Sequence, residues 1–132
     1  MKKLFASEKI YISKSKIKNS GRGVYASQNI KKGESIEICP IIQVNEHDAY
    51  NLGESILVEY FFFFDKNNKR LLVALGFGSI YNHSRKPNAK YKIKSRENIM
   101  EFVSTSDIKK DDEITIHYNA SNPNNKIPLW FE

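Results

Sequence analysis

The stretch ALGFGSIYNHSRKPNA, residues 74–89, decides how this sequence is interpreted. Small residues lead into Asn82, His83 and Ser84, and after a two-residue gap come Pro87-Asn88-Ala89. This arrangement gathers hydrogen-bond donors and acceptors beside apolar residues, which suits a pocket for a polar ligand. Taken alone, it also fits an ordinary turn in which Asn82 and Ser84 bond the local backbone and His83 is a satisfied core histidine.

Two further segments, one on each side of this stretch, have unusual content for loops. Before it, residues 19–25 contain two glycines separated by one residue, which lets a backbone approach a ligand closely. The same pattern also fits a glycine-rich hairpin turn. After it, residues 108–119 join a charged turn to a strand that ends in Tyr118. The plain alternative there is a solvated turn followed by a half-buried aromatic residue.

The rest of the chain consists of short apolar-alternating segments, each ended by turn residues. This pattern predicts a mostly β domain, because no window keeps helical periodicity over three turns. We expect Pro40 to interrupt the extended chain. The expected strands cover residues 10–12, 23–26, 35–38, 41–44, 56–64, 70–75, 91–94, 99–103 and 114–116, with a helical turn within 46–55.

Composition limits the class of protein further. The 132 residues include 21 lysines and arginines against 15 acidic residues, and the formal net charge of +6 suits a polyanionic partner or simple solubility. Cys39 is the single cysteine, which excludes a disulfide framework within one chain. The three histidines are more than thirty residues apart and lack ligand spacing, so we expect no metal site.

The sequence also predicts a soluble protein that does not enter a membrane. Glu8 and Lys9 end the apolar N-terminal residues before a signal-peptide core can form. The longest aromatic run, residues 60–64, is much too short to cross a bilayer.

In this order and at this spacing, the three segments resemble the SET domain of protein lysine methyltransferases. Residues 21–26 match its opening G-x-G segment, residues 82–89 its N-H-S-x-x-P-N-A signature, and residues 112–118 its E-E-[LI]-T-x-x-Y segment. The compact form looks most like minimal viral and bacterial members. The resemblance implies a SET fold of short strands and small sheets with a knot-like C-terminal crossing. It assigns residues 1–119 to the SET domain and residues 120–132 to a short C-terminal tail.

The resemblance also implies a cofactor site. Members of the family bind S-adenosylmethionine in a concave pocket and admit the target lysine from the opposite face. By this likeness Gly21, Arg22 and Gly23 contact the methionine part of the cofactor, largely through backbone groups. Asn82 holds it by its side chain, and His83 contacts the adenine mainly through its main chain.

The catalytic residues and the tail follow from the same likeness. Tyr118 aligns with the family's catalytic tyrosine, and Tyr60 looks like a tyrosine that lines the lysine channel. Trp130 is a candidate to stack on the adenine or to wall the channel, so that the tail covers the site. The alternative for Trp130 and Phe131 is an apolar anchor packed on the domain.

The activity implied is that of an enzyme, a protein-lysine N-methyltransferase that uses S-adenosylmethionine and acts on a protein or peptide lysine. Histone tails are the substrate class that the resemblance suggests. The acidic residues within 107–113 either line a peptide groove or form a solvated turn. We expect a cytoplasmic location, or the host nucleus for a viral or intracellular bacterial source.

Two readings of other classes stay open beside this one. The first is a catalytically silent SET-fold interaction module. The second is a basic nucleic-acid-associated protein, because Lys90, Lys92 and Lys94 alternate along one expected strand. Nucleic-acid binding is also a hypothesis for an accessory function of an enzyme. Minimal members of the family can complete their surfaces by pairing, so a homodimer is a further hypothesis.

Overall fold

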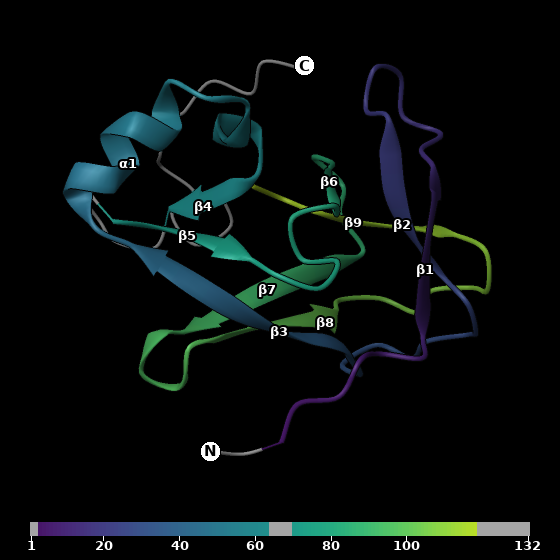
Figure 1. Ribbon diagram of the computed structural model, residues 1–132. Coiled ribbons are helices and arrows are strands. Elements are labelled where there is room, and N and C mark those ends of the chain that lie inside the picture. Colours follow the sequence, from purple (N-terminus) through teal and green to yellow (C-terminus); the bar gives the residue numbers. More distant parts are fainter. Residues whose placement is uncertain (1–2, 64–69, 119–132) are drawn as a thin grey trace.

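Two sheets make up the fold, which the computed structural model describes over residues 3–63 and 70–118 (Figure 1). The first sheet has the strand order β1-β2-β9-β6 and the second the order β4-β5-β3-β8-β7. The strands are β1 (Ile10–Lys14), β2 (Arg22–Ala26), β3 (Ser35–Val44), β4 (Phe61–Phe63), β5 (Leu71–Ala74), β6 (Asn82–His83), β7 (Ala89–Lys94), β8 (Ile99–Ser104) and β9 (Glu113–Ile116). The helices are α1 (Glu46–Gly53) and the 3-10 helices η1 (Ile56–Glu59) and η2 (Ser95–Glu97).

The mostly β prediction is confirmed, and the strands follow the alternation of the sequence. In β7 the residues Ala89 and Tyr91 are buried, while Lys90, Lys92 and Lys94, which alternate with the inward residues, are exposed. Strand β2 is buried almost throughout because it lies between β1 and β9. A strand with a neighbour on each side and a packed face has few positions left for solvent.

Pro40 does not interrupt the chain, which corrects the sequence-based expectation. Strand β3 runs unbroken for ten residues through this proline. Residues 35–40 of β3 pair with β8 and residues 41–44 pair with β5, so Pro40 lies where the strand changes partners. Its missing N–H is not needed there, and its carbonyl oxygen accepts a hydrogen bond from the backbone N–H of Leu75 at 2.9 Å.

The segment expected as one long strand over residues 56–64 divides into η1 and β4. Ser55 caps η1 by accepting a hydrogen bond from the backbone N–H of Leu57, which favours a helical turn over an extended start. Strand β4 then pairs antiparallel with β5, with Phe62 opposite Leu72, as the hairpin prediction requires. The expected helical turn is α1, which begins after the cap residue Asn45.

Aromatic stacking fills the centre of the core between the two sheets. The ring of Phe102 lies parallel to that of Tyr81 with their centroids 4.1 Å apart, and both side chains are almost completely buried. Tyr91 and Phe62 continue this aromatic contact, with ring centroids 5.2 Å apart. Residues from β4, β7 and β8 and the residue before β6 therefore pack on one aromatic centre.

No helix in the described part of the chain is long and apolar enough to span a membrane. The tail predicted at residues 120–132, and with it Trp130 and the C-terminal crossing, lies outside the described residues. The boundary of the SET domain at residue 119 therefore stays a prediction.

We predict that Phe102→Ala lowers the free energy of unfolding by about 3–5 kcal/mol, because it leaves a large cavity against Tyr81. Denaturant unfolding followed by circular dichroism measures this loss. The matched control is Ile42→Ala on β3, whose side chain is 53% exposed and should cost less than about 1 kcal/mol. Equal losses in the two variants would contradict the assignment of Phe102 to the centre of the core.

Candidate functional site

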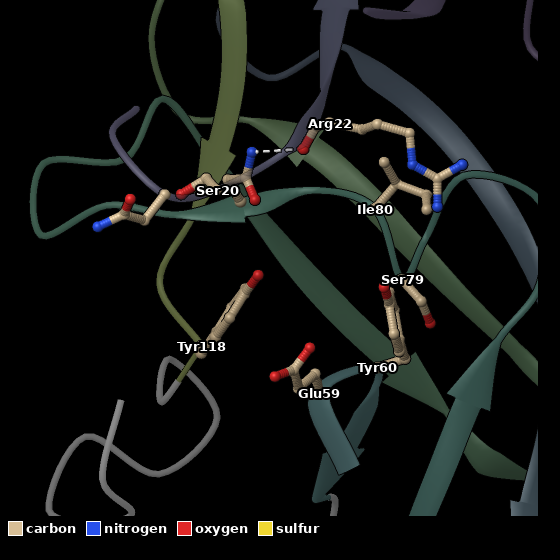
Figure 2. Close-up of a pocket in the computed structure, with 9 residues that line it drawn as sticks. Ser20, Arg22, Glu59, Tyr60, Ser79, Ile80 and Tyr118 are labelled. Atoms are coloured by element: carbon tan, nitrogen blue, oxygen red, sulfur yellow. Dashed lines mark hydrogen bonds between the residues drawn. The ribbon is translucent and has the colours of Figure 1, made fainter. Parts of the chain in front are cut away.

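A cavity of about 160 Å³ lies where the ends of several elements meet. It is lined by Asn19, Ser20, Arg22, Glu59, Tyr60, Ser79, Ile80, Asn82 and Tyr118. Figure 2 shows Tyr118, Glu59 and Tyr60 on one side of this space, with Ser20, Arg22 and Ile80 across from them. The lining therefore combines two phenol groups, two amides, two serine hydroxyls, one carboxylate and one guanidinium with a single aliphatic side chain.

The parallel pairing of β6 with β9 brings two of the sequence motifs together. Asn82 pairs with Thr115 and His83 with Ile116. Asn88 fixes this register, since its side chain accepts from the backbone N–H of Thr115 and donates to the carbonyl oxygen of Glu113, at 2.9 and 3.0 Å. A two-residue strand is too short to be stable alone, so these amide bonds add to the pairing.

Asn82 turns its amide toward the G-x-G segment. Its Nδ2 donates to the carbonyl oxygen of Arg22 at 2.8 Å (Figure 2) and to Glu113 Oε2 at 2.9 Å. A Cβ at Gly23 would lie 2.9 Å from the carboxyl carbon of Glu113 and 3.1 Å from Asn82 Nδ2. Gly23 is therefore required by packing against this pair, in addition to any contact with a ligand.

Tyr118 is held at both its hydroxyl and its backbone. The hydroxyl donates to the carbonyl oxygen of Tyr81 at 2.8 Å, and the backbone N–H donates to His83 Nδ1 at 3.1 Å. The carbonyl oxygen of Tyr118 accepts from the hydroxyl of Tyr91 at 2.9 Å. The ring of Phe62 contacts the ring of Tyr118 edge to face, with the two ring centroids 6.4 Å apart. This phenol is thus oriented on several sides before any ligand arrives.

The pKa of the Tyr118 hydroxyl is raised, so the hydroxyl stays protonated. Burial raises the pKa of Tyr118 to about 12, and the nearby carboxylate of Glu113 and the phenol of Tyr60 add to the shift. At neutral pH the hydroxyl is therefore a hydrogen-bond donor to the Tyr81 carbonyl. It can orient a reacting group, and it is not suited to act as a general base.

The cavity has charges of opposite sign in its lining. Arg22 contributes a guanidinium and Glu59 a carboxylate, and both side chains are exposed at its rim. A ligand that carries an ammonium and a carboxylate, as an amino acid does, would find a partner for each group here.

The structure brings together four of the residues that the sequence singled out, since Arg22, Tyr60, Asn82 and Tyr118 all line the cavity. Gly21 and Gly23 flank Arg22 in the chain. His83 is buried and supports the backbone of Tyr118. Trp130 lies outside the described residues.

No group of histidine, cysteine, aspartate and glutamate side chains within residues 3–63 and 70–118 is arranged to hold a metal ion. His83 and His117 do meet, with their rings 4.6 Å apart in an edge-to-face contact. This contact packs β6 against the end of β9.

Sequence reasoning missed two carboxylates of the site. The sequence grouped Glu113 with the acidic turn, but its carboxylate accepts from Ser15 Oγ and Asn82 Nδ2. Asp107, Asp111 and Asp112, in contrast, are exposed in turns, as in the solvated alternative. Glu59 was overlooked although it precedes Tyr60. Its position beside a candidate channel tyrosine was the one available signal.

Comparison with known proteins gives a consistent assignment. The family model described as SET domain matches residues 21–119. A Schizosaccharomyces pombe protein named histone-lysine N-methyltransferase, H3 lysine-37 specific, is 33% identical over 113 residues, which cover 85% of this chain and 71% of that protein.

Solved structures agree with this match. A crystal structure from Plasmodium falciparum, described as that of a candidate histone methyltransferase, superposes with a TM-score of 0.65 and 38% identity, covering 86% of this chain and 96% of the other. The Chaetomium thermophilum polycomb repressive complex 2 matches with a TM-score of 0.73 over 95% of this chain. That match spans 17% of the larger chain at 20% identity, and it shows the fold alone.

We predict that Tyr118 gives a tyrosinate absorbance step at about pH 12, well above the ordinary phenol value of 10.0. The folded state then binds more protons than the unfolded state between pH 10.0 and about 12, so stability falls as the pH rises through this window. The Tyr118→Phe variant should lack the step in an ultraviolet titration. A Tyr118 that ionises near pH 10 would contradict the buried, hydrogen-bonded geometry.

Proposed function

Because the chain belongs to the SET-domain family of protein-lysine methyltransferases, we propose that it transfers a methyl group from S-adenosylmethionine to the ε-amine of a protein lysine, with histone tails as the substrate class. The observation that carries this proposal is the meeting of Asn82, Tyr60 and Tyr118 in one cavity. These are the residues that the family likeness assigns to the cofactor, the lysine channel and catalysis.

The described residues suit the methionine part of the cofactor. Arg22 offers a guanidinium for a carboxylate, and the amide of Asn82 is fixed by Arg22 O and Glu113 at the edge of the cavity. When bound, S-adenosylmethionine supplies an electrophilic methyl group on a sulfonium. The cavity of about 160 Å³ is smaller than the roughly 300–1,000 Å³ usual for a whole ligand, so these residues would hold only part of the cofactor.

The lysine side is supported by the two tyrosines and by Glu59. A free lysine has a pKa near 10.4, so only roughly one molecule in two thousand is a neutral nucleophile at pH 7. Glu59 would attract the incoming ammonium at the rim, and the aromatic surface beyond it would favour the neutral amine. Tyr118, with its proton held by a raised pKa, would orient the amine and exclude water.

The substrate class is supported by the relative from Schizosaccharomyces pombe, whose name specifies lysine-37 of histone H3. The high coverage of both chains in that alignment and in the Plasmodium falciparum structure makes the same kind of substrate a reasonable starting point. A protein tail is also compatible with a cavity of this size, because only the lysine side chain must enter it.

We predict that Tyr118→Phe keeps cofactor binding and loses most turnover, since the ring packing remains while the hydroxyl that orients the amine is removed. Intact-mass analysis of core histones incubated with the protein and S-adenosylmethionine measures mass increments of one methyl group. The matched control is Tyr11→Phe, whose hydroxyl bonds Asp111 on another part of the surface.

Three outcomes separate the hypotheses. Methylation that persists in Tyr118→Phe would overturn the role of this tyrosine. Cofactor binding without any methylated histone would keep the enzyme class and move the search to other proteins. The absence of both would favour a catalytically silent SET-fold module.

We predict that Asn82→Ala lowers cofactor affinity by about tenfold to a hundredfold, because it removes the amide that the family likeness assigns to the cofactor and leaves the Glu113 carboxylate without this bond. Titration calorimetry with S-adenosylmethionine measures the change, and thermal unfolding confirms that the variant is folded. Asn29→Ala is the control, because Asn29 is exposed and its side chain bonds the backbone N–H of Lys110. Unchanged affinity in Asn82→Ala would remove Asn82 from the cofactor site.

A further inference from the structure

The outer face of β7 is a row of lysines, which we call the basic face: Lys90, Lys92 and Lys94. All three side chains are exposed, and the residues that alternate with them point into the core. Strand β7 forms one edge of the five-stranded sheet, so only β8 lies beside it in that sheet (Figure 1). The row is therefore accessible along the whole strand.

Further cations lie at both ends of the basic face. Arg85 and Lys86 precede β7, and Arg96 in η2 follows it, and all three are exposed. Among the described residues, Glu101 forms an ion pair with Lys94 at 3.5 Å, and Glu97 lies in η2. The cations named here outnumber these two carboxylates, so this region of the described chain carries an excess of positive charge.

The spacing of the row suits a polymer with regularly repeated negative charges. Alternate residues of a strand are separated by about 6.8 Å, and phosphates recur regularly along one strand of B-DNA with a rise of roughly 3.4 Å along the helix axis. Because the phosphates also wind around this axis, the row can contact a short run of neighbouring phosphates, and the flexible lysine side chains can adjust to their positions. An irregular acidic protein surface offers no such repeat.

The aromatic residue of β7 faces the wrong way to stack on a base. Tyr91 is 7% exposed, and its hydroxyl bonds the carbonyl oxygen of Tyr118 inside the molecule. Binding to single strands usually depends on exposed aromatic side chains that stack on the bases. The basic face therefore fits the phosphates of a duplex better than an unpaired strand.

We infer that the basic face binds duplex DNA through its phosphates, without preference for base sequence. A basic enzyme and a basic substrate tail repel each other, and a polyanion that binds both would hold them together. This second role, recruitment to a lysine substrate that is itself bound to DNA, rests on the proposed function. The binding of DNA does not.

The test compares two triple variants with the same loss of charge. In the first, Lys90, Lys92 and Lys94 become glutamine. In the matched control, Lys32, Lys109 and Lys110 become glutamine; these lysines are exposed on the turns beside the Ile30–Ile108 bridge. Fluorescence anisotropy with a labelled duplex measures affinity between about 50 and 200 mM salt.

Neutralising the basic face should reduce the slope of log affinity against log salt by about 1.8 to 2.7, the lower value applying if Glu101 already satisfies Lys94. Over this salt range the wild-type chain would then lose roughly 10- to 40-fold more affinity than the variant. The control variant should keep a slope close to that of the wild type.

Equal weakening in both variants would reduce the effect to net charge and overturn the inference. So would the absence of duplex binding by the wild-type chain at low salt, tighter binding to a single strand, or stronger retention by polyglutamate. Methylation of a free histone peptide, measured in parallel, separates the two proposals. If the wild-type chain does not methylate the peptide, this counts against the proposed function. DNA binding is judged from the anisotropy measurement alone.

Discussion

The carboxylate of Glu113 is the interaction on which the site depends. It accepts hydrogen bonds from Ser15 Oγ to both of its oxygens, from the backbone N–H of Lys16 and from Asn82 Nδ2. These donors come from two separated parts of the chain, and a charged acceptor makes each bond stronger than a neutral one. Because Asn82 also bonds Arg22, the same carboxylate fixes the position of the G-x-G segment.

A second carboxylate supports the site from inside the core. Glu37 is buried and accepts from the hydroxyl of Tyr81 at 2.8 Å and from the backbone N–H of Phe77 at 3.0 Å. Tyr81 in turn offers the carbonyl oxygen that receives the hydroxyl of Tyr118. Gly76 permits this arrangement, since its φ of +62° and a Cβ 2.7 Å from the Glu37 carboxylate both exclude a side chain. The orientation of Tyr118 is thus linked, through Tyr81, to a buried carboxyl group in the neighbouring sheet.

The sequence predicted most of what is local and little of what depends on distant neighbours. Alternation located the strands, the three ordered motifs placed Arg22, Asn82 and Tyr118 at one site, and the family resemblance added Tyr60, and all four line the cavity. The two-residue strand β6 gives no periodic signal, although it brings these motifs together. Glu113 looked like part of a solvated turn because its partners are about 30 and 100 residues away. Pairing across such distances cannot be inferred from the residues beside it.

Strand β7 shows how one alternating segment can serve two purposes. Its inward residues include Tyr91, which supports the backbone of Tyr118, and its outward residues are the lysines of the basic face. A register shift of one residue would turn three lysines into the core and Tyr91 toward solvent, so burial enforces the register strongly. The lysines therefore stand in a fixed row because the opposite side of the strand is needed to hold the catalytic tyrosine of the proposed mechanism. A polyanion bound to this row would rest on the strand whose Tyr91 holds the backbone of Tyr118.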